Sequence, residues 1–307
     1  MKKTFYDEIS GNKWRTILLF VMFFILVAII GIVLGVFFFR NLYAGLIVTL
    51  IIGIVYSLIM YKSGASTILS AVKAKPVTKQ QDPYLYHVVE GLAIAAGLKV
   101  KPKIYMIEED SMNAFATGIS PEKSYICVTS GLRKKMNRQE LEGVIAHEMS
   151  HIKNFDIRVM LLAAVLVGVI ILISDIMLRS FLWGGAGRSR GGSRDNGGAQ
   201  IVLILIALGL AILAPIIAQM IKLAISRKRE YLADASAVQL TRNPSGLASA
   251  LSKIKNDTDT VVDTVNKATA HLFIENPLRH KKKITWIASM FNTHPPIDKR
   301  ISRLNTM

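Results

Sequence analysis

Residues 137–151 read NRQELEGVIAHEMSH. Asn137 is followed three residues later by Glu140, and this pair has the pattern of a capping box, in which each side chain hydrogen-bonds the other residue's backbone. The pattern predicts that a helix begins here. Charged residues such as Glu142 and Lys153 surround the stretch, so we expect this helix to lie outside a lipid bilayer.

The same helix carries a His-Glu-x-x-His motif from His147 to His151. Two histidines four residues apart share one face of a helix, so both imidazoles can bind one zinc ion. Glu148 lies beside the metal without binding it, where it can take a proton from water at the metal. This pattern predicts peptide hydrolysis without a covalent intermediate.

A catalytic zinc needs a third protein ligand and one open position. Asn154 and Ile157 stand where a metzincin-type extension requires Gly and His, which excludes that class. Glu230 is the better candidate. His151 precedes the third apolar stretch by about eight residues, and Glu230 follows the fourth by about five, or roughly 12 Å and 8 Å of helix. An antiparallel pair of spans would bring both to a similar height outside the bilayer.

The composition favours a membrane protein, because the 307 residues are 51% hydrophobic and 19% charged, with a mean hydropathy of +0.39. A transmembrane helix needs about 20 apolar residues, and four stretches meet or approach this length: Thr16–Phe39, Ala44–Tyr61, Val159–Leu178 and Ile201–Ile225. The expected organisation is a first transmembrane hairpin, a catalytic part, a second hairpin with a Gly-rich loop (184–198), and a second catalytic part, with bounds 1–61, 62–158, 159–225 and 226–307.

The net charge of +17 fits contact with anionic lipid head groups better than nucleic-acid binding, because no basic stripe interleaved with aromatic residues is present. Lys62, Lys73 and Lys75 follow the second stretch, which places both outer ends of the first hairpin in the cytoplasm. By the positive-inside rule, basic residues lie on the cytoplasmic side, so the arginines in the loop 184–198 conflict with a loop that crosses to the far side. Two alternatives therefore stay open: the loop crosses the membrane, or the third and fourth stretches do not fully span it.

The catalytic part is expected to combine helices with a small sheet. Asp82 and Pro83 have the pattern of an N-cap and a first helical residue. Lys103–Ile107 and Ser124–Thr129 are predicted to be strands. The single cysteine, Cys127, allows no intrachain disulfide. The fold class is thus a mainly α membrane protein, with four transmembrane helices and a zincin-like α+β catalytic domain.

Four motifs occur in order along the chain: Asn113–Gly118, His147–His151 with Asp156, Glu230–Asp234, and Thr293–Pro296. Together they resemble an HtpX-type membrane metalloprotease and, more distantly, the CAAX prenyl endopeptidases. The resemblance covers nearly the whole chain. It implies one zinc ion per chain bound by His147, His151 and Glu230, with Glu148 as the catalytic acid and base. It also implies a bacterial inner-membrane, multi-pass protein that degrades damaged or unfolded membrane proteins as quality control under stress.

Several other residues can have either a role at the active site or a purely structural one. Asp234 or Asp156 can orient a zinc-bound histidine, since such histidines donate their other nitrogen to a carboxylate; either can instead be an exposed helix acid. His294 can stabilise an oxyanion or simply be a turn residue. One segment lies near a predicted strand, and a substrate peptide can pair with the edge of that strand through main-chain hydrogen bonds. The alternative is that the segment is a plain loop. It consists of Asn113, Ala114, Phe115 and Ala116.

Competing functions are a zinc-binding membrane scaffold or chaperone without catalysis, a site-two type intramembrane protease and a metal transporter. A purely structural zinc site would close four ligands and would not need an acid at Glu148. An intramembrane protease would have its His pair within an apolar stretch. A transporter would carry paired ionisable residues inside several spans, where only Asp175 and Lys222 qualify. The sequence predicts neither the cleavage preference nor the oligomeric state.

Overall fold

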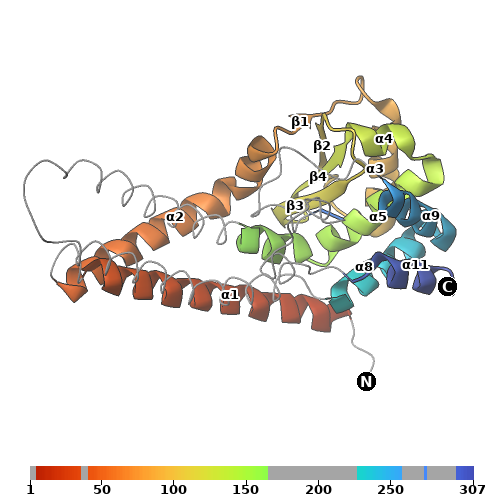
Figure 1. Ribbon diagram of the computed structural model, residues 1–307. Coiled ribbons are helices and arrows are strands. Elements are labelled where there is room, and N and C mark those ends of the chain that lie inside the picture. The colour runs from red at the N-terminus through yellow and green to blue at the C-terminus, as the bar shows by residue number, and fades with distance from the viewer. Residues whose placement is uncertain (1–4, 36–40, 165–226, 258–272, 275–294) are drawn as a thin grey trace, which may run out of the picture.

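The computed structural model describes residues 5–35, 41–164, 227–257, 273–274 and 295–307. Two long helices form a hairpin at one side, and the remaining described elements build a mostly helical domain around a small mixed sheet (Figure 1). The expected third and fourth apolar stretches, apart from the start of the third, and the Gly-rich loop lie outside the described residues.

The hairpin consists of α1 (Phe5–Leu34) and α2 (Leu42–Ala71). The two helices approach closely near the turn, where a side chain at Gly45 would collide with the backbone of Gly35. Within the described residues, Leu42–Ile59 is the one helical stretch long and apolar enough to cross a membrane; the apolar part of α1, Ile17–Ile32, is shorter. α2 continues past the expected boundary at residue 61, and its last turns pack against the sheet.

The sheet has the strand order β1-β2-β4-β3. Its strands are β1 (Lys75–Pro76), β2 (Lys103–Ile107), β3 (Ala114–Ser120) and β4 (Lys123–Thr129). β2 and β4 are parallel, whereas β1 with β2 and β3 with β4 are antiparallel. The prediction of β2 is confirmed, and β4 begins one residue earlier than predicted. The Asn113–Gly118 segment does not merely lie near a strand, because most of it forms β3 at the sheet edge.

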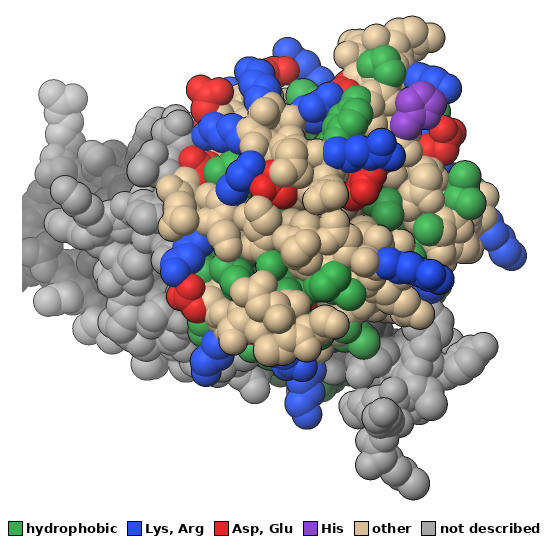
Figure 2. All heavy atoms as spheres, turned by 90° about the vertical axis from the view of Figure 1, so that its right-hand side faces the viewer, with side chains coloured by type: hydrophobic (Ala, Val, Ile, Leu, Met, Phe, Trp, Pro, Cys, Tyr) green, Lys and Arg blue, Asp and Glu red, His purple; other side chains and the backbone are tan. Residues whose placement is uncertain are grey.

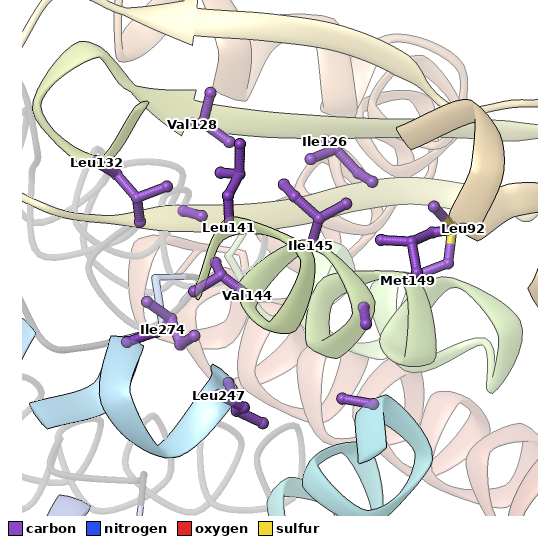
Figure 3. Close-up of a cluster of buried hydrophobic side chains, with 14 of the residues drawn as sticks. Leu92, Ile126, Val128, Leu132, Leu141, Val144, Ile145, Met149, Leu247 and Ile274 are labelled. Carbon is purple, nitrogen blue, oxygen red and sulfur yellow. The ribbon is translucent and has the colours of Figure 1, made fainter. Parts of the chain in front are cut away.

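Two helices cover one face of the sheet: α3 (Pro83–Ala96) and α5 (Arg138–Lys153). Asp82 caps α3 with Pro83 in its first turn, and Asn137 and Glu140 form a complete capping box on α5. Both helix starts are thus confirmed. Figure 3 shows the core that results, in which side chains of α5 lie between the sheet and the C-terminal helices; it includes Ile126, Val128, Leu141, Val144, Ile145, Met149 and Leu247.

The other face of the sheet packs against the end of α2 and against residues 156–164, which are helical. The prediction that the His151 helix runs straight into the third apolar stretch is wrong. α5 ends at Lys153, and Phe155 has a left-handed backbone with φ of 59°. That conformation breaks the helical hydrogen-bond ladder, so the chain changes direction before Asp156.

Four further helices are described: α4 (Ser130–Lys135), α8 (Arg227–Thr241), α9 (Pro244–Asn256) and α11 (Ile297–Leu304). α8 and α9 both pack against α5, and α11 packs against α8 and α9. The C-terminal elements therefore surround the helix that carries the histidine motif. On the face turned away from the hairpin tip, basic and acidic side chains are interspersed rather than gathered by sign (Figure 2).

Candidate metal centre

Three predicted ligands meet at the contact between α5 and α8. His147 and His151 project from one face of α5, and Glu230 comes from the first turn of α8. Their ligand atoms all lie within 4.8 Å of one another. The exposed fractions of these residues are 1%, 4% and 2%, so the site is buried. The helical spacing of the histidines and the packing of α8 on α5 together produce this arrangement.

The distances suit a tetrahedral metal. The Nε2 atoms of His147 and His151 are 3.2 Å apart, and the Glu230 carboxylate oxygens lie 3.6 Å and 3.8 Å from these nitrogens. With zinc–nitrogen distances of about 2.0–2.1 Å, two ligands of a tetrahedral site are separated by about 3.3 Å. Two imidazoles and one carboxylate therefore fit a zinc ion after small adjustments, and leave a fourth position for water or substrate.

A carboxylate orients each histidine. Nδ1 of His147 lies 3.0 Å from Asp234, and Nδ1 of His151 lies 3.0 Å from Asp156. A carboxylate can only accept a hydrogen bond, so the hydrogen of each neutral ring is on Nδ1 and the Nε2 lone pair faces the metal position. The structure thus brings together both aspartates that the sequence suggested as orienting residues.

Two buried arginines were missed by the sequence analysis. Arg229 donates to Asp156 at 3.0 Å, and Arg300 forms a two-point contact with Asp234 at 2.7 Å and 2.9 Å. Arg229 lies next to the predicted ligand Glu230, and no local pattern marked it as buried. Arg300 did leave a signal, because Ile297 and Leu304 place it on the buried face of α11.

The formal charges of the centre favour a divalent cation. Among the described residues, four buried carboxylates and two buried guanidinium groups surround the ligand atoms: Glu148, Asp156, Glu230, Asp234, Arg229 and Arg300. With both histidines neutral, their sum is −2. A divalent ion bound by the two neutral imidazoles balances that charge, so the low-dielectric interior then holds no uncompensated charge.

Burial and neighbouring charges shift the pKa values of several groups in the centre. Burial raises the pKa of Glu148, although the histidines oppose this effect. Burial lowers the pKa of His151, but the hydrogen bond to Asp156 and the charge of Glu230 outweigh it and raise the pKa to about 9. Burial raises the pKa of Asp234, yet Arg300 and His147 reverse this and hold it at about 2. A metal must therefore displace a proton from His151 to bind there.

Of the four residues suggested for substrate binding, Ala116 contacts the centre. Its backbone N–H donates to the Glu148 carboxylate. The backbone N–H and C=O of Ala114 both have partners within the chain. The N–H donates to the Asn113 side chain, and the C=O accepts from the backbone N–H of Ile274. Phe115 points to the opposite face and packs on Phe273, with ring centroids 4.8 Å apart. The backbone of β3 thus meets the Glu148 carboxylate at Ala116.

The remaining site prediction, His294, lies outside the described residues, and its role stays a prediction. The two prolines that follow it, Pro295 and Pro296, are described and lead directly into α11, for which Pro296 is the N-cap. In the sequence, His294 stands six positions before Arg300 of α11.

Comparisons with known proteins place this centre in a family. The model of peptidase family M48 matches residues 79–307. "Protease HtpX homolog" proteins from Listeria monocytogenes serotype 4a and Listeria innocua serovar 6a are 46% and 47% identical, over 98% of this chain and 99% of theirs. A crystal structure of S. mikatae Ste24p is 19% identical with a TM-score of 0.47, covering 91% of this chain and 61% of that one. The chain belongs to peptidase family M48 and is a metalloendopeptidase.

Proposed function

We propose that the metal is zinc, one ion per chain, bound by His147, His151 and Glu230. The observation that carries this proposal is the convergence of two Nε2 atoms and one carboxylate in a buried centre with a formal charge of −2. Two imidazoles with one glutamate are the ligand set of several catalytic zinc sites, which keep one position open.

When bound, zinc supplies a Lewis acid that polarises the scissile carbonyl and acidifies water. Glu148 is the general base: its carboxylate accepts the proton of the attacking water and passes it to the leaving amine. The Ala116 N–H holds that carboxylate at the outer edge of β3. An extended substrate that pairs with this edge would lie beside Glu148, which positions the peptide bond for attack.

The chain acts in a membrane as a multi-pass protein with four spans, and its catalytic parts face the cytoplasm. Only 11% of the apolar stretch Leu42–Ile59 is buried inside the protein, and its exposed side chains include Ile47, Ile51 and Ile52. Lipid is the solvent that suits such a surface. Lys62, Lys73 and Lys75 then mark the cytoplasmic end of the hairpin. A reporter in the loop 184–198 should read as external; a cytoplasmic signal would contradict four spans.

Damaged or unfolded membrane proteins are the proposed substrates. Pairing with the edge of β3 requires an extended backbone, which folded helices do not offer and unfolded segments do. The alternative is a zinc-binding scaffold or chaperone without catalysis. The buried Glu148 argues against it, because an acid beside the metal that is not a ligand adds negative charge without adding a bond.

Cleavage of unfolded casein by the purified full chain in detergent tests the catalytic part of the proposal. Glu148→Gln should lower turnover by about 10²–10⁴-fold while zinc content is unchanged. Glu142→Gln is the matched control, since it makes the same chemical change at a partly exposed acid of α5, six positions before Glu148, and should leave turnover intact. Full turnover in Glu148→Gln would refute the general base. Bound zinc without any cleavage would favour the scaffold.

A variant of His294 tests the remaining catalytic role. If this imidazole stabilises the oxyanion, His294→Ala should lower turnover while zinc stays bound, because the residue contributes to the transition state and not to the metal. The zinc content of the same preparation serves as the internal control. Unchanged turnover would make His294 a turn residue.

A further inference from the structure

Arg300 brings a positive charge from the last helix of the chain into the metal centre. Its side chain is only 1% exposed, although the rest of α11 around it is amphipathic and short. Nε and Nη2 donate to the two oxygens of Asp234 at 2.9 Å and 2.7 Å, and Nη1 lies 3.7 Å from Oε2 of Glu230. One guanidinium therefore contacts the orienting carboxylate of one ligand and the carboxylate of another.

A role in packing alone does not explain an arginine here. Ile297 and Leu304 fill the same buried face of α11 with apolar side chains, and a hydrophobic residue at position 300 would avoid the desolvation of a charge. The planar guanidinium matches a carboxylate at two points, which a lysine ammonium cannot do. The geometry of the contact, rather than its charge alone, is thus what this position supplies.

The contact restrains both carboxylates of α8. Oδ1 of Asp234 accepts from Arg300 and also from Nδ1 of His147, so the arginine fixes the acid that fixes the imidazole. At Glu230, Oε2 faces Arg300 while Oε1 lies 3.6 Å from Nε2 of His151. At this distance the arginine attracts Oε2 through its charge rather than through a hydrogen bond, and Oε2 also lies 3.8 Å from Nε2 of His147.

We propose that Arg300 is a positioning residue of the metal centre, and that docking of α11 completes a zinc site whose three ligands all come from α5 and α8. This inference rests on the proposed zinc function. It predicts that zinc affinity depends on a residue 153 positions from His147 in sequence that is not itself a ligand. Loss of partners that orient metal ligands typically weakens metal binding by about 10–100-fold.

Zinc affinity of the full chain in detergent, measured by competition with a chromophoric chelator, tests the proposal without relying on activity. Arg300→Met should weaken zinc binding by about 10–100-fold, and Arg300→Lys should weaken it nearly as much. Arg303→Met is the matched control. Arg303 lies on the same helix and stacks 4.2 Å over Tyr231 of α8, so its loss weakens helix docking without touching a carboxylate of the centre. Its zinc affinity should stay within about threefold of wild type.

A double-substitution cycle and a spectrum separate positioning from general stabilisation. If Arg300 acts through Asp234, the combination of Arg300→Met with Asp234→Asn should weaken binding much less than the product of the two single effects. The visible spectrum of the Co²⁺-loaded Arg300→Lys protein should also change in intensity, because the ligand geometry changes.

Three results would overturn the positioning role: zinc affinity within about threefold of wild type in Arg300→Lys, equal losses in the Arg300 and Arg303 variants, or multiplicative effects in the cycle. Arg300→Lys keeps the charge, so it stands in if Arg300→Met does not fold. A wild-type chain that binds no zinc would instead overturn the proposed function itself. The two failures are therefore distinguishable.

Discussion

Glu140 ties the start of the metal-binding helix to α9, and its substitution should lower stability by a predictable amount. One carboxylate oxygen, Oε2, accepts from the backbone of Asn137 at 2.9 Å and from Lys253 at 2.7 Å. The other, Oε1, accepts from Ser249 at 2.7 Å. The Glu140 side chain is 3% exposed, whereas that of Lys253 is 43% exposed.

The magnitude follows from the bonds that each variant loses. In Glu140→Gln the amide oxygen can keep the bonds from Asn137 and Lys253 while the NH₂ donates to the Ser249 hydroxyl, so this variant loses only the negative charge that faces Lys253. Glu140→Ala loses all three bonds. A neutral bond contributes about 1 kcal/mol and one to a charged group about 1.5–3 kcal/mol, and the exposure of Lys253 reduces the second value. We therefore expect a loss of about 1 kcal/mol for Gln and about 3 kcal/mol for Ala.

Thermal unfolding of the zinc-free chain in detergent measures this effect, and the loss of about 3 kcal/mol expected for Glu140→Ala corresponds to a midpoint lower by about 8 °C. Glu142→Ala removes a partly exposed acid on the same helix that pairs with the exposed Arg138, and it should shift the midpoint by less than about 2 °C. Burial raises the pKa of Glu140, but Lys253, Ser249 and Asn137 outweigh burial and lower it. Its contribution is thus complete above the ordinary glutamate pKa of about 4.3 and is lost as pH falls further. Equal midpoints for both variants at pH 7 would refute the reasoning.

Three further predictions concern the same core. Gly143→Ala should destabilise by about 1–3 kcal/mol, because its Cβ would lie 2.8 Å from the backbone of α9; Gly91→Ala on α3, with open space around it, is the control for the unfolding midpoint. Asp156→Asn should weaken zinc binding by about tenfold, and unchanged chelator competition would contradict its orienting role. Cys127 is fully buried, which raises the pKa of its thiol, so mass spectrometry should detect alkylation only after unfolding.

Local signals predicted the parts of the fold that depend on neighbours in sequence. The caps at Asp82 and Asn137 each involve residues within three positions, and the structure has both. The histidine pair is equally local, because helical spacing alone aligns His147 with His151. Such features can be predicted because the physical interaction and the sequence pattern span the same few residues.

Features that depend on distant partners were predicted less well. The segment from Ala114 to Gly118 is buried on both sides of the strand and consists mostly of small residues, so no alternation of apolar and polar residues marks it as β3. Its strand conformation follows from pairing with β4 and from the close fit at Gly118, where a Cβ would collide with the backbone of Lys123. The helix break at Phe155 also escaped prediction, because an aromatic residue rarely adopts a left-handed backbone.

The charges of the metal centre connect its chemistry with the assembly of the C-terminal half. Asp156 links to Arg229 of α8 across 73 positions, and Asp234 links to Arg300 of α11 across 66. The first link joins the helical segment that follows α5 to α8, and the second joins α8 to α11. With both histidines neutral, as metal binding requires, the protein groups carry a formal charge of −2 at the point where these helices meet.

Metal binding and helix docking must therefore stabilise each other. An ion at 100 times its Kd adds about 2.7 kcal/mol to the stability of the state that binds it, which is comparable with the loss expected for Glu140→Ala. Residues that appear in no ligand motif, such as Arg300, thus affect the metal through the fold, and the metal affects the fold through them.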